Sequence, residues 1–314
     1  MYYLNFARME IFKLPLLLAF VLLLSITVYG QTSKYPKIID NQFILQGDKC
    51  SWDADAVHTF SIVEANKDDY KYWAYYGLDH YEKDEHIRKG GLARSNDLVN
   101  WEKYGYNPII VSNCRWPSVV IHNGTFYMFY DEYNKANDSR IVMAKSKNGI
   151  DFENRTVVVP YANGEQNQNS FIYFNKSDSI FYLFYYNGTE RAEKDKRWSI
   201  YLKKSNNVTD LAAQKSHEVL TSDKTLAAPS VAYYNNTYYL LVEEFDKAKD
   251  KWVTNAFHSD YIDKGYQRVS NNPILFDNDA CAFQYVFDNH LYASYSHCLN
   301  LQKSVWILRL IKLN

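Results

Sequence analysis

Side chains that could do chemistry recur in short segments along this chain of 314 residues. Carboxyl groups among them could act as a pair, one protonated to donate a proton and one ionised to accept it. Arginine, amide and tryptophan side chains beside such a pair would bind and stack on a polar ligand. The candidates are Trp52, Asp53, Asp55 and His58 in W-D-A-D-A-V-H, Arg115 and Trp116 in C-R-W, Glu165, Gln168 and Asn169 in E-Q-N-Q-N, Asp279 in N-D-A-C, and Glu243, Glu244 and His297 just after aromatic runs.

A repeat organises these segments. Five aromatic runs start 54, 55, 57 and 53 residues apart, at Y-W-A-Y-Y (72–76), F-Y-M-F-Y (126–130), F-Y-L-F-Y (181–185), Y-Y-L-L-V (238–242) and L-Y-A-S-Y (291–295). Each follows a turn of Gly, Asn or Asp residues, and an apolar run such as P-S-V-V-I-H precedes the turn. Strand-forming runs on both sides of such turns predict five β-hairpins.

Two further strands follow each of the first four hairpins. The third strand is expected to end on Ser95, Ser146, Ser205 or Ser259. The fourth is expected at N-P-I-I-V (107–111), T-V-V-V-P (156–160), H-E-V-L-T (217–221) and N-P-I-L-F (272–276). The fifth unit ends at V-W-I-L-R-L-I (305–311), and N-Q-F-I-L-Q (41–46), near the start of the chain, could supply its missing strand.

Five four-stranded units closed in this way predict an all-β, five-bladed β-propeller, because closure removes free sheet edges. A pair of β-sandwiches, the alternative, would not need so regular a period. In a propeller, the residues just before each innermost strand line a central funnel, so the candidates of all five units would meet in one pocket. Aligned second strands place Gly77, Asp131, Tyr186, Glu243 and Ser296 at one level, and Leu78, Glu132, Asn187, Glu244 and His297 at the next.

The stretch A-R-S-N-D-L-V-N-W-E (93–102), the early W-D and the repeated P-S-V strands resemble the five-bladed propellers of glycoside hydrolase family 43 and its relatives in families 32, 62, 117 and 130. The similarity covers nearly all of residues 31–314. It implies an enzyme that hydrolyses a plant- or algal-type polysaccharide or oligosaccharide. It also implies three acids: an Asp base in blade one, an orienting Asp in blade three and a Glu acid in blade four.

This chain departs from that scheme in two blades. Asn169 stands where blade three would hold its Asp, and Ala227 stands where blade four would hold its Glu. Asp53 or Asp55 fits the base, Glu243 or Glu244 could reach the rim as acid, and Glu165 could supply the blade-three carboxylate. The family 117 resemblance also makes His297 a candidate acid. We expect an inverting glycosidase with acid and base about 6.5–9.5 Å apart. The expected substrate-binding residues are Trp52, His58, Arg115, Trp116, Gln168, Asn169, Asp279 and His297.

Two other classes of protein fit the sequence. Loss of two acids suits a carbohydrate-binding propeller without catalysis, and a protein-binding propeller is the third alternative. No cofactor motif is present and no set of metal ligands is readable, although a polar central channel would leave room for a structural calcium ion. Turnover of oligosaccharides would separate an enzyme from a binding module.

The first thirty residues are expected to be a secretion signal, followed by one domain over 31–314. Arg8 and Lys13 precede the apolar run 14–28, which is short for a membrane span, and Val28-Tyr29-Gly30 suits cleavage before Gln31. An uncleaved signal anchor is the alternative. The expected location is therefore secreted or periplasmic. The formal net charge of −1 gives no field that would attract nucleic acid or, after signal cleavage, a membrane, and we expect a monomer.

Four cysteines in an exported chain predict two disulfides, and we expect the pairs Cys50–Cys114 and Cys281–Cys298. The competing pairing joins Cys50 to Cys281 and leaves Cys114 to Cys298, which would lie across the ring. Asn-x-Ser/Thr sequons predict glycosylated surface loops if the host glycosylates. They lie at Asn123, Asn137, Asn154, Asn175, Asn187, Asn207 and Asn235.

Overall fold

The computed structural model describes residues 33–48, 51–54, 56–82, 85–111, 113–136, 138–161, 166–188, 198–246, 251–275, 278–300 and 305–314. The chain forms two units, Met1–Lys34 and Tyr35–Asn314. The expected signal peptide lies outside the described residues. Within the described ranges, no helix has the length and apolar character needed to cross a bilayer.

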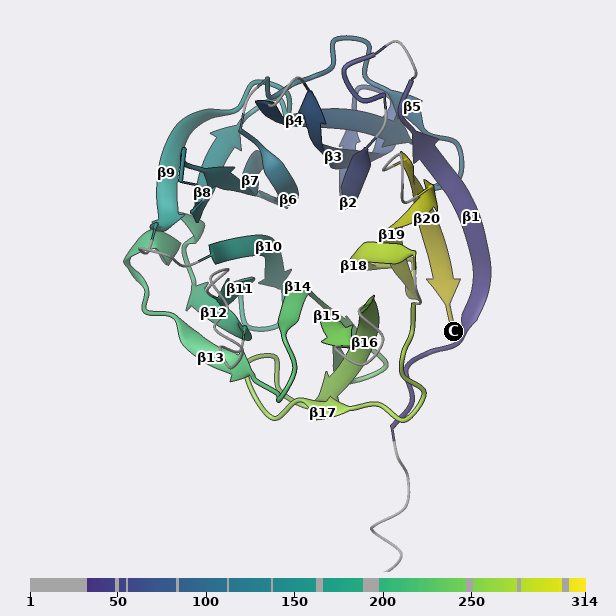
Figure 1. The fold of residues 1–314 in the computed structure, drawn as a ribbon, viewed down its shortest axis with the longest axis vertical. Coiled ribbons are helices and arrows are strands. Elements are labelled where there is room, and N and C mark those ends of the chain that lie inside the picture. Colours follow the sequence, from purple (N-terminus) through teal and green to yellow (C-terminus); the bar gives the residue numbers. More distant parts are fainter. Residues whose placement is uncertain are drawn as a thin grey trace, which may run out of the picture. The chain divides into compact units, whose positions relative to one another are not determined.

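The second unit is the expected five-bladed propeller, a ring of four-stranded antiparallel sheets (Figure 1). A single short 3₁₀-helix in the described ranges, η1 (Val208–Ala213), joins β12 to β13. From the centre outward, blade 1 is β2 (Val57–Lys67), β3 (Tyr70–Glu82), β4 (Glu85–Ser95) and β5 (Glu102–Lys103); blade 2 is β6 (Arg115–His122), β7 (Thr125–Tyr133), β8 (Ser139–Ser146) and β9 (Glu153–Val159); blade 3 is β10 (Gln166–Asn175), β11 (Ile180–Gly188), β12 (Ser199–Ser205) and β13 (His217–Leu220); blade 4 is β14 (Leu226–Tyr234), β15 (Thr237–Asp246), β16 (Lys251–Ser259) and β17 (Gln267–Arg268); and blade 5 is β18 (Asp279–Phe287), β19 (His290–Asn300), β20 (Val305–Leu313) and β1 (Ile38–Gln46).

The ring closes as the sequence predicted. Strand β1, from near the start of the chain, is the outermost strand of blade 5 and pairs antiparallel with β20, from Ile38 opposite Leu313 to Gln46 opposite Ile307. Beyond the strands, the backbone N–H and C=O groups of Lys37 and Asn314 exchange two hydrogen bonds of 2.9 Å. The last blade therefore has no missing strand.

The third strands of blades 1 to 4 end on the four predicted serines, because each serine hydroxyl bonds the backbone of the turn that follows. Ser95 Oγ accepts a hydrogen bond from the N–H of Leu98 at 3.1 Å, and Ser146 Oγ accepts one from the N–H of Gly149 at 2.9 Å. These bonds hold the chain in a turn directly after the strand.

The predicted fourth strands are wrong in blades 1 and 4. The outer strands there are only β5 and β17, and the predicted segments make single bridges, Ile110 with Gly90 and Leu275 with Thr254. In each segment an asparagine side chain makes the two hydrogen bonds to the third strand that the backbone of a fourth strand would make. Asn107 bonds both the N–H and the C=O of Leu92, at 2.9 and 2.8 Å.

Asn272 repeats this arrangement with Ala256, at 2.7 and 2.8 Å. The next residue in both segments is a proline, which has no N–H to extend a ladder. An Asn-Pro pair at this place therefore stops the pairing that its apolar neighbours would favour.

The aromatic runs form the core between blades. Trp73 and Tyr75 of β3 are fully buried and pack against Phe126 and Met128 of β7. Polar links join neighbouring inner strands, as where Ser61 Oγ accepts a hydrogen bond from the N–H of Val119 at 2.9 Å. Such contacts hold the inner strands of different blades in fixed relation, and this fixes the site that they line.

The predicted disulfides are not formed. Cys114, Cys281 and Cys298 are free and buried, and Cys50 lies outside the described residues. The backbone N–H of Cys298 bonds the C=O of Asn278 at 2.7 Å, which sets Cys298 opposite a residue three places before Cys281. Three residues of strand span about 10 Å, whereas a disulfide allows about 6.8 Å between Cα atoms. Cys281 and Cys298 are therefore too far apart along the strands to be joined.

The sequons do not all lie in exposed loops as predicted. Asn175 is buried, and its amide donates hydrogen bonds to Asp178 at 2.8 Å and to the hydroxyl of Tyr238 at 3.1 Å. Asn187 is partly buried and donates to Asn167. Asn137 lies outside the described residues. The exposed sequons are Asn123, Asn154, Asn207 and Asn235.

Candidate functional site

A cavity of about 340 Å³ lies where the N-terminal ends of the five inner strands meet. Every blade contributes to it through its inner strand. The inner-strand residues are His58, Arg115, Trp116, Gln168, Asn169, Ala227, Ala280 and Cys281. The second strands add Gly77, Leu78, Asp79, Tyr186 and Glu243, and Trp198, Trp252 and Trp306 come from the starts of third strands.

The five inner strands share one irregularity, a β-bulge at the edge of the cavity. The bulges lie between His58 and Phe60, Arg115 and Ser118, Gln168 and Phe171, Ala227 and Ser230, and Ala280 and Phe283. Each contains a residue with a positive φ: Thr59 at 53°, Trp116 at 59°, Asn169 at 56°, Ala228 at 51° and Cys281 at 62°. Left-handed backbone is rare for threonine and tryptophan, and such strain gathers at functional sites.

No acid stands at these bulges. The residue before each positive φ is His58, Arg115, Gln168, Ala227 or Ala280, and all five line the cavity. Thr59 lies in the bulge of blade 1, just as Asn169 and Ala227 lie in the bulges of blades 3 and 4. The acids of the cavity therefore come from second strands.

The register confirms the sequence alignment of the second strands. His58 pairs with Gly77, Arg115 with Asp131, Gln168 with Tyr186, Ala227 with Glu243, and Ala280 with Ser296. Because side chains alternate along a strand, neighbours at these levels point in opposite directions. This alternation separates Glu243 from Glu244.

Glu243 lines the cavity, and Glu244 faces away from it. The Glu244 carboxylate is fully buried, forms an ion pair with Arg268 and accepts a hydrogen bond from Asn255 at 2.6 Å. The Oε1 atom of Glu243 accepts one from the backbone N–H of Cys281 at 2.5 Å. Burial raises the pKa of Glu243, and the Cys281 N–H and the Arg115 charge offset only part of this rise. The environment of Glu243 therefore favours its protonated form.

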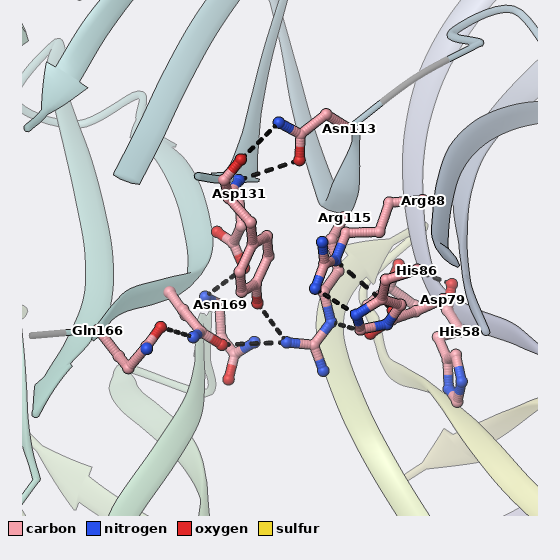
Figure 2. Close-up of polar contacts among 12 residues, drawn as sticks. His58, Asp79, His86, Arg88, Asn113, Arg115, Asp131, Gln166 and Asn169 are labelled. Atoms are coloured by element: carbon pink, nitrogen blue, oxygen red, sulfur yellow. Dashed lines mark hydrogen bonds and ion pairs between the residues drawn. The ribbon is translucent and has the colours of Figure 1, made fainter. Parts of the chain in front are cut away.

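Asp79 has the opposite environment (Figure 2). Its carboxylate forms ion pairs with Arg115 and His86, and Arg88 Nε lies 3.7 Å away. Burial alone would raise the pKa of Asp79, but the charge of Arg115 and the contact with His86 outweigh it and hold the pKa well below its usual range. Asp79 is therefore ionised. Burial also lowers the pKa of His58 to about 4, so this imidazole is neutral near neutral pH.

Arg115 connects side chains of blades 1 to 3, since besides Asp79 it bonds one residue of blade 2 and one of blade 3. Its Nη1 donates to Tyr133 Oη at 2.5 Å and to Gln168 Oε1 at 3.0 Å (Figure 2). Asp131, its strand partner, is fully buried and accepts a hydrogen bond from the N–H of Asn169 at 2.9 Å. Burial raises the pKa of Asp131 to about 7, against the opposing effects of that N–H and of Arg115.

Tryptophans of blades 3 to 5 also line the cavity, and the sequence did not predict them. Trp198 stacks on Tyr186 with ring centroids 4.8 Å apart, and Trp252 lies 6.1 Å from Trp198. Trp306 lies 5.1 Å from His58. A signal was present, since Trp198 and Trp252 each stand seven residues before the serine that ends their strand.

Asp53 and Trp52 do not line the cavity, contrary to the sequence expectation. Asp53 is fully buried, forms an ion pair with Lys103 of β5 at 2.7 Å and accepts a hydrogen bond from Tyr76 Oη at 3.1 Å. Trp52 stacks on the ring of Tyr76, with centroids 5.8 Å apart. Lys103 neutralises the carboxylate, so Asp53 serves the packing of blade 1.

Asp279 and His297 also lie outside the cavity lining. They are opposite each other on β18 and β19, and His297 Nδ1 lies 2.7 Å from Asp279 Oδ1. Asp55 and Glu165 lie outside the described residues. Of the predicted residues, the cavity brings together Glu243, His58, Arg115, Trp116, Gln168 and Asn169.

The sequence left room for a calcium ion in the central channel. In the described part of the chain, no three His, Cys, Asp or Glu side chains are grouped to hold a metal. Trp116, Phe171 and Phe283 also pack together on the inner strands, with Phe283 at 5.9 Å from Trp116 and 5.2 Å from Phe171. These rings give the channel apolar walls.

Sequence comparison finds no match, either to a protein-family profile or among curated proteins. Solved structures are similar in fold. A thermostable family-43 glycoside hydrolase matches with a TM-score of 0.65 at 16% identity, covering 82% of this chain and 90% of its own. The catalytic domain of a GH62 α-L-arabinofuranosidase from Coprinopsis cinerea matches with 0.64 at 11%, covering 89% and 98%.

An α-L-arabinofuranosidase from Podospora anserina, solved in complex with cellotriose, matches with a TM-score of 0.62 at 10% identity, covering 90% of this chain and 99% of its own. The protein thus has the five-bladed propeller fold of glycoside hydrolase families 43 and 62. At these identities the likeness concerns the fold, and residue roles must come from the cavity itself.

Proposed function

We propose that this protein is a secreted or periplasmic, monomeric glycosidase in which Glu243 is the general acid and Asp79 the general base. The observation that carries the proposal is the contrast between these two carboxyl groups in one cavity. Burial raises the pKa of Glu243, whereas Arg115 and His86 hold the pKa of Asp79 low. Two acids whose environments drive their pKa values apart are what acid–base catalysis of glycoside hydrolysis requires.

The proposed reaction is a single displacement. Asp79 takes a proton from a water molecule, whose oxygen bonds to the anomeric carbon. The glycosidic C–O bond breaks, and the leaving oxygen takes the proton of Glu243. This step inverts the anomeric configuration. Arg115 fixes the orientation of Asp79, and the N–H of Cys281 fixes that of Glu243.

The size and the aromatic lining of the cavity also indicate what kind of substrate it could bind. Its volume of about 340 Å³ is near the lower end of the roughly 300–1,000 Å³ of small-molecule pockets, enough for one or two sugar units. Trp198 and Trp252 offer faces on which a sugar ring can stack. We therefore propose that the enzyme binds the end of a plant- or algal-type oligosaccharide or polysaccharide.

The test is release of product from a panel of arabino-, xylo-, galacto- and fructo-oligosaccharides and aryl glycosides. Turnover by the wild type and its loss in both Glu243→Gln and Asp79→Asn would support the proposal. Glu218→Gln, an exposed residue of β13, is the matched control and should keep full turnover. Proton NMR of the first product should show the inverted anomer. Folded wild type that releases nothing from the panel would contradict enzymatic function.

Carbohydrate binding without hydrolysis is the second candidate, and one observation favours it. Thr59, Asn169 and Ala227 leave the inner-strand bulges without acids, and both oxygens of Asp79 are already in ion pairs. A binding module would retain oligosaccharides on affinity electrophoresis and release no reducing ends.

A further inference from the structure

We infer that the sugar bound in this cavity carries an acid group, as a uronic acid does, and that Arg115 binds its carboxylate. The inference deepens the proposed function and rests on it for the claim that the ligand is a sugar. It comes from the donors and charges of the cavity, which suit an anion better than a neutral sugar.

The cavity lining combines charged and aromatic groups. Blades 1 and 2 provide Asp79 and Arg115, with Arg88 and His86 behind them (Figure 2). Blades 3 to 5 provide the tryptophans described above. A ligand that fills the cavity therefore meets both aromatic rings and the guanidinium of Arg115. A pyranose ring with one carboxylate combines the two matching features.

Two hydrogen-bond donors of residues that line the cavity lack an acceptor among the described residues. The Arg115 side chain is 31% exposed, and its Nη2 bonds no group in the described ranges, whereas Nε and Nη1 are engaged (Figure 2). The neighbouring Trp116 also lines the cavity, and its indole N–H is buried without an acceptor among the described residues. Both groups donate only, and a carboxylate accepts only, whereas a sugar hydroxyl needs both kinds of partner.

The charges point the same way. Two arginines, Arg88 and Arg115, face the single ionised carboxylate of Asp79. Burial raises the pKa values of the other two acids near Arg115, which are Asp131 and Glu243, and so reduces their negative charge. An anionic ligand would offset the remaining positive charge, and charge-assisted bonds to Arg115 would hold it.

The experiment measures binding, so that turnover does not enter. Calorimetry at mildly acidic pH compares matched methyl glycosides: galacturonate with galactose, glucuronate with glucose, and mannuronate with mannose. Galactose 6-sulfate is a further arm, since a sulfate carries the same charge with a different shape. We expect one uronate to bind at least about tenfold more tightly than its neutral partner, as one charge-assisted bond would give.

Variants of Arg115 assign the preference to this residue. Arg115→Gln should reduce it below about threefold, and Arg115→Lys should keep part of it, because lysine retains the charge without the planar fork. Loss of Arg115 leaves Asp79 buried without its partner, so Asp79→Asn with Arg115→Gln serves as a second, charge-balanced variant. Lys145→Gln, an exposed residue of β8, removes one positive charge elsewhere and should change nothing.

Three outcomes would overturn the inference: no uronate binds more tightly than its neutral partner, only the sulfated sugar is preferred, or the folded Arg115→Gln variant keeps the full preference. The fate of the proposed function is separate. Hydrolysis of neutral glycosides without uronate preference would leave the glycosidase standing and remove this inference. A preference for a uronate without release of product would support this inference and contradict the glycosidase activity.

Discussion

Glu243 of blade 4 accepts a hydrogen bond of 2.5 Å from the backbone N–H of Cys281 of blade 5. The bond crosses the boundary between two blades and ends at a bulge residue with a φ of 62°. The placement of the proposed acid therefore depends on the backbone of the neighbouring blade. Glu244, one residue further on, is held by Arg268 on the opposite face of the same strand.

The two adjacent glutamates should respond differently to the same substitution. Glu243→Gln should lower turnover by at least about a hundredfold with little change in stability. Glu244→Gln should keep turnover and lower the free energy of unfolding by about 1–3 kcal/mol, because Arg268 loses its buried partner at a partly exposed site. Rates at a temperature where both variants are folded, and urea unfolding curves, measure the two effects. Equal turnover in the two variants would contradict the role of Glu243.

The pH dependence of turnover should show one descending limb. Glu243 must be protonated, and burial raises its pKa, so the rate falls as pH rises through that raised value. Asp79 must be ionised, and its pKa is held well below the usual range, so no loss of rate is expected on mild acidification. Arg115 lowers both pKa values, so Arg115→Lys should preserve the shape of the pH–rate profile. A rate that rises toward alkaline pH would be inconsistent with this assignment.

Asp131 should make the protein less stable as pH rises. The folded state holds the proton of Asp131 up to a pKa of about 7, whereas the unfolded chain releases it near pH 4, so the folded state binds more protons between these values. Stability from this group is greatest below about pH 4 and falls by about 1.4 kcal/mol per pH unit until the folded pKa is passed.

Asp131→Asn should remove this dependence, because asparagine can still accept the hydrogen bond from Asn169 and carries no charge. Chemical denaturation at acidic and alkaline pH, compared with Asp260→Asn at an exposed position, measures the effect. The idea fails if Asp131→Asn does not gain stability over the wild type at alkaline pH.

Asn107 and Asn272 should stabilise blades 1 and 4. Each side chain bonds both backbone groups of one residue on the third strand, so substitution by alanine leaves an N–H and a C=O without partners. We expect a loss of about 1–3 kcal/mol in the free energy of unfolding for each. Asn206→Ala, at an exposed position, should be neutral. Equal stability of all three variants would show that the side chains do not replace a strand.

The architecture was readable from the sequence because it is encoded locally. Aromatic runs with Asn, Asp and Gly turns gave the hairpins, and Ser95 marks a strand end through its own hydroxyl. The same kind of local pattern gave a wrong prediction at N-P-I-I-V (107–111), where an apolar, β-branched run favours a strand but does not form one. Its asparagine side chain competes for Leu92, and no count of apolar residues shows that.

The site was only partly readable, because its contacts are distant in sequence. Asp53 stands where a funnel residue was expected, but Lys103 draws it into the body of blade 1. The sequence could not tell which of Glu243 and Glu244 faces the cavity, because this depends on which side chains of β15 point inward. Asp79 lies one residue past the two aligned levels, Gly77 and Leu78, and its low pKa depends on Arg115 from another blade.

The pairing of β1 with β20 has a consequence for how the protein is made. Among the described strands, β1 is the first to be synthesised and its partner β20 is the last, so β1 cannot join its sheet until β20 has been made. The buried side chains Ile44 and Leu45 of β1 pack against residues of blade 1, such as Phe60, and against Leu308 and Leu310 of β20, so part of their burial also waits for the last strand. Closure of the ring therefore depends on a pairing of very long contact order, a kind of contact that forms slowly.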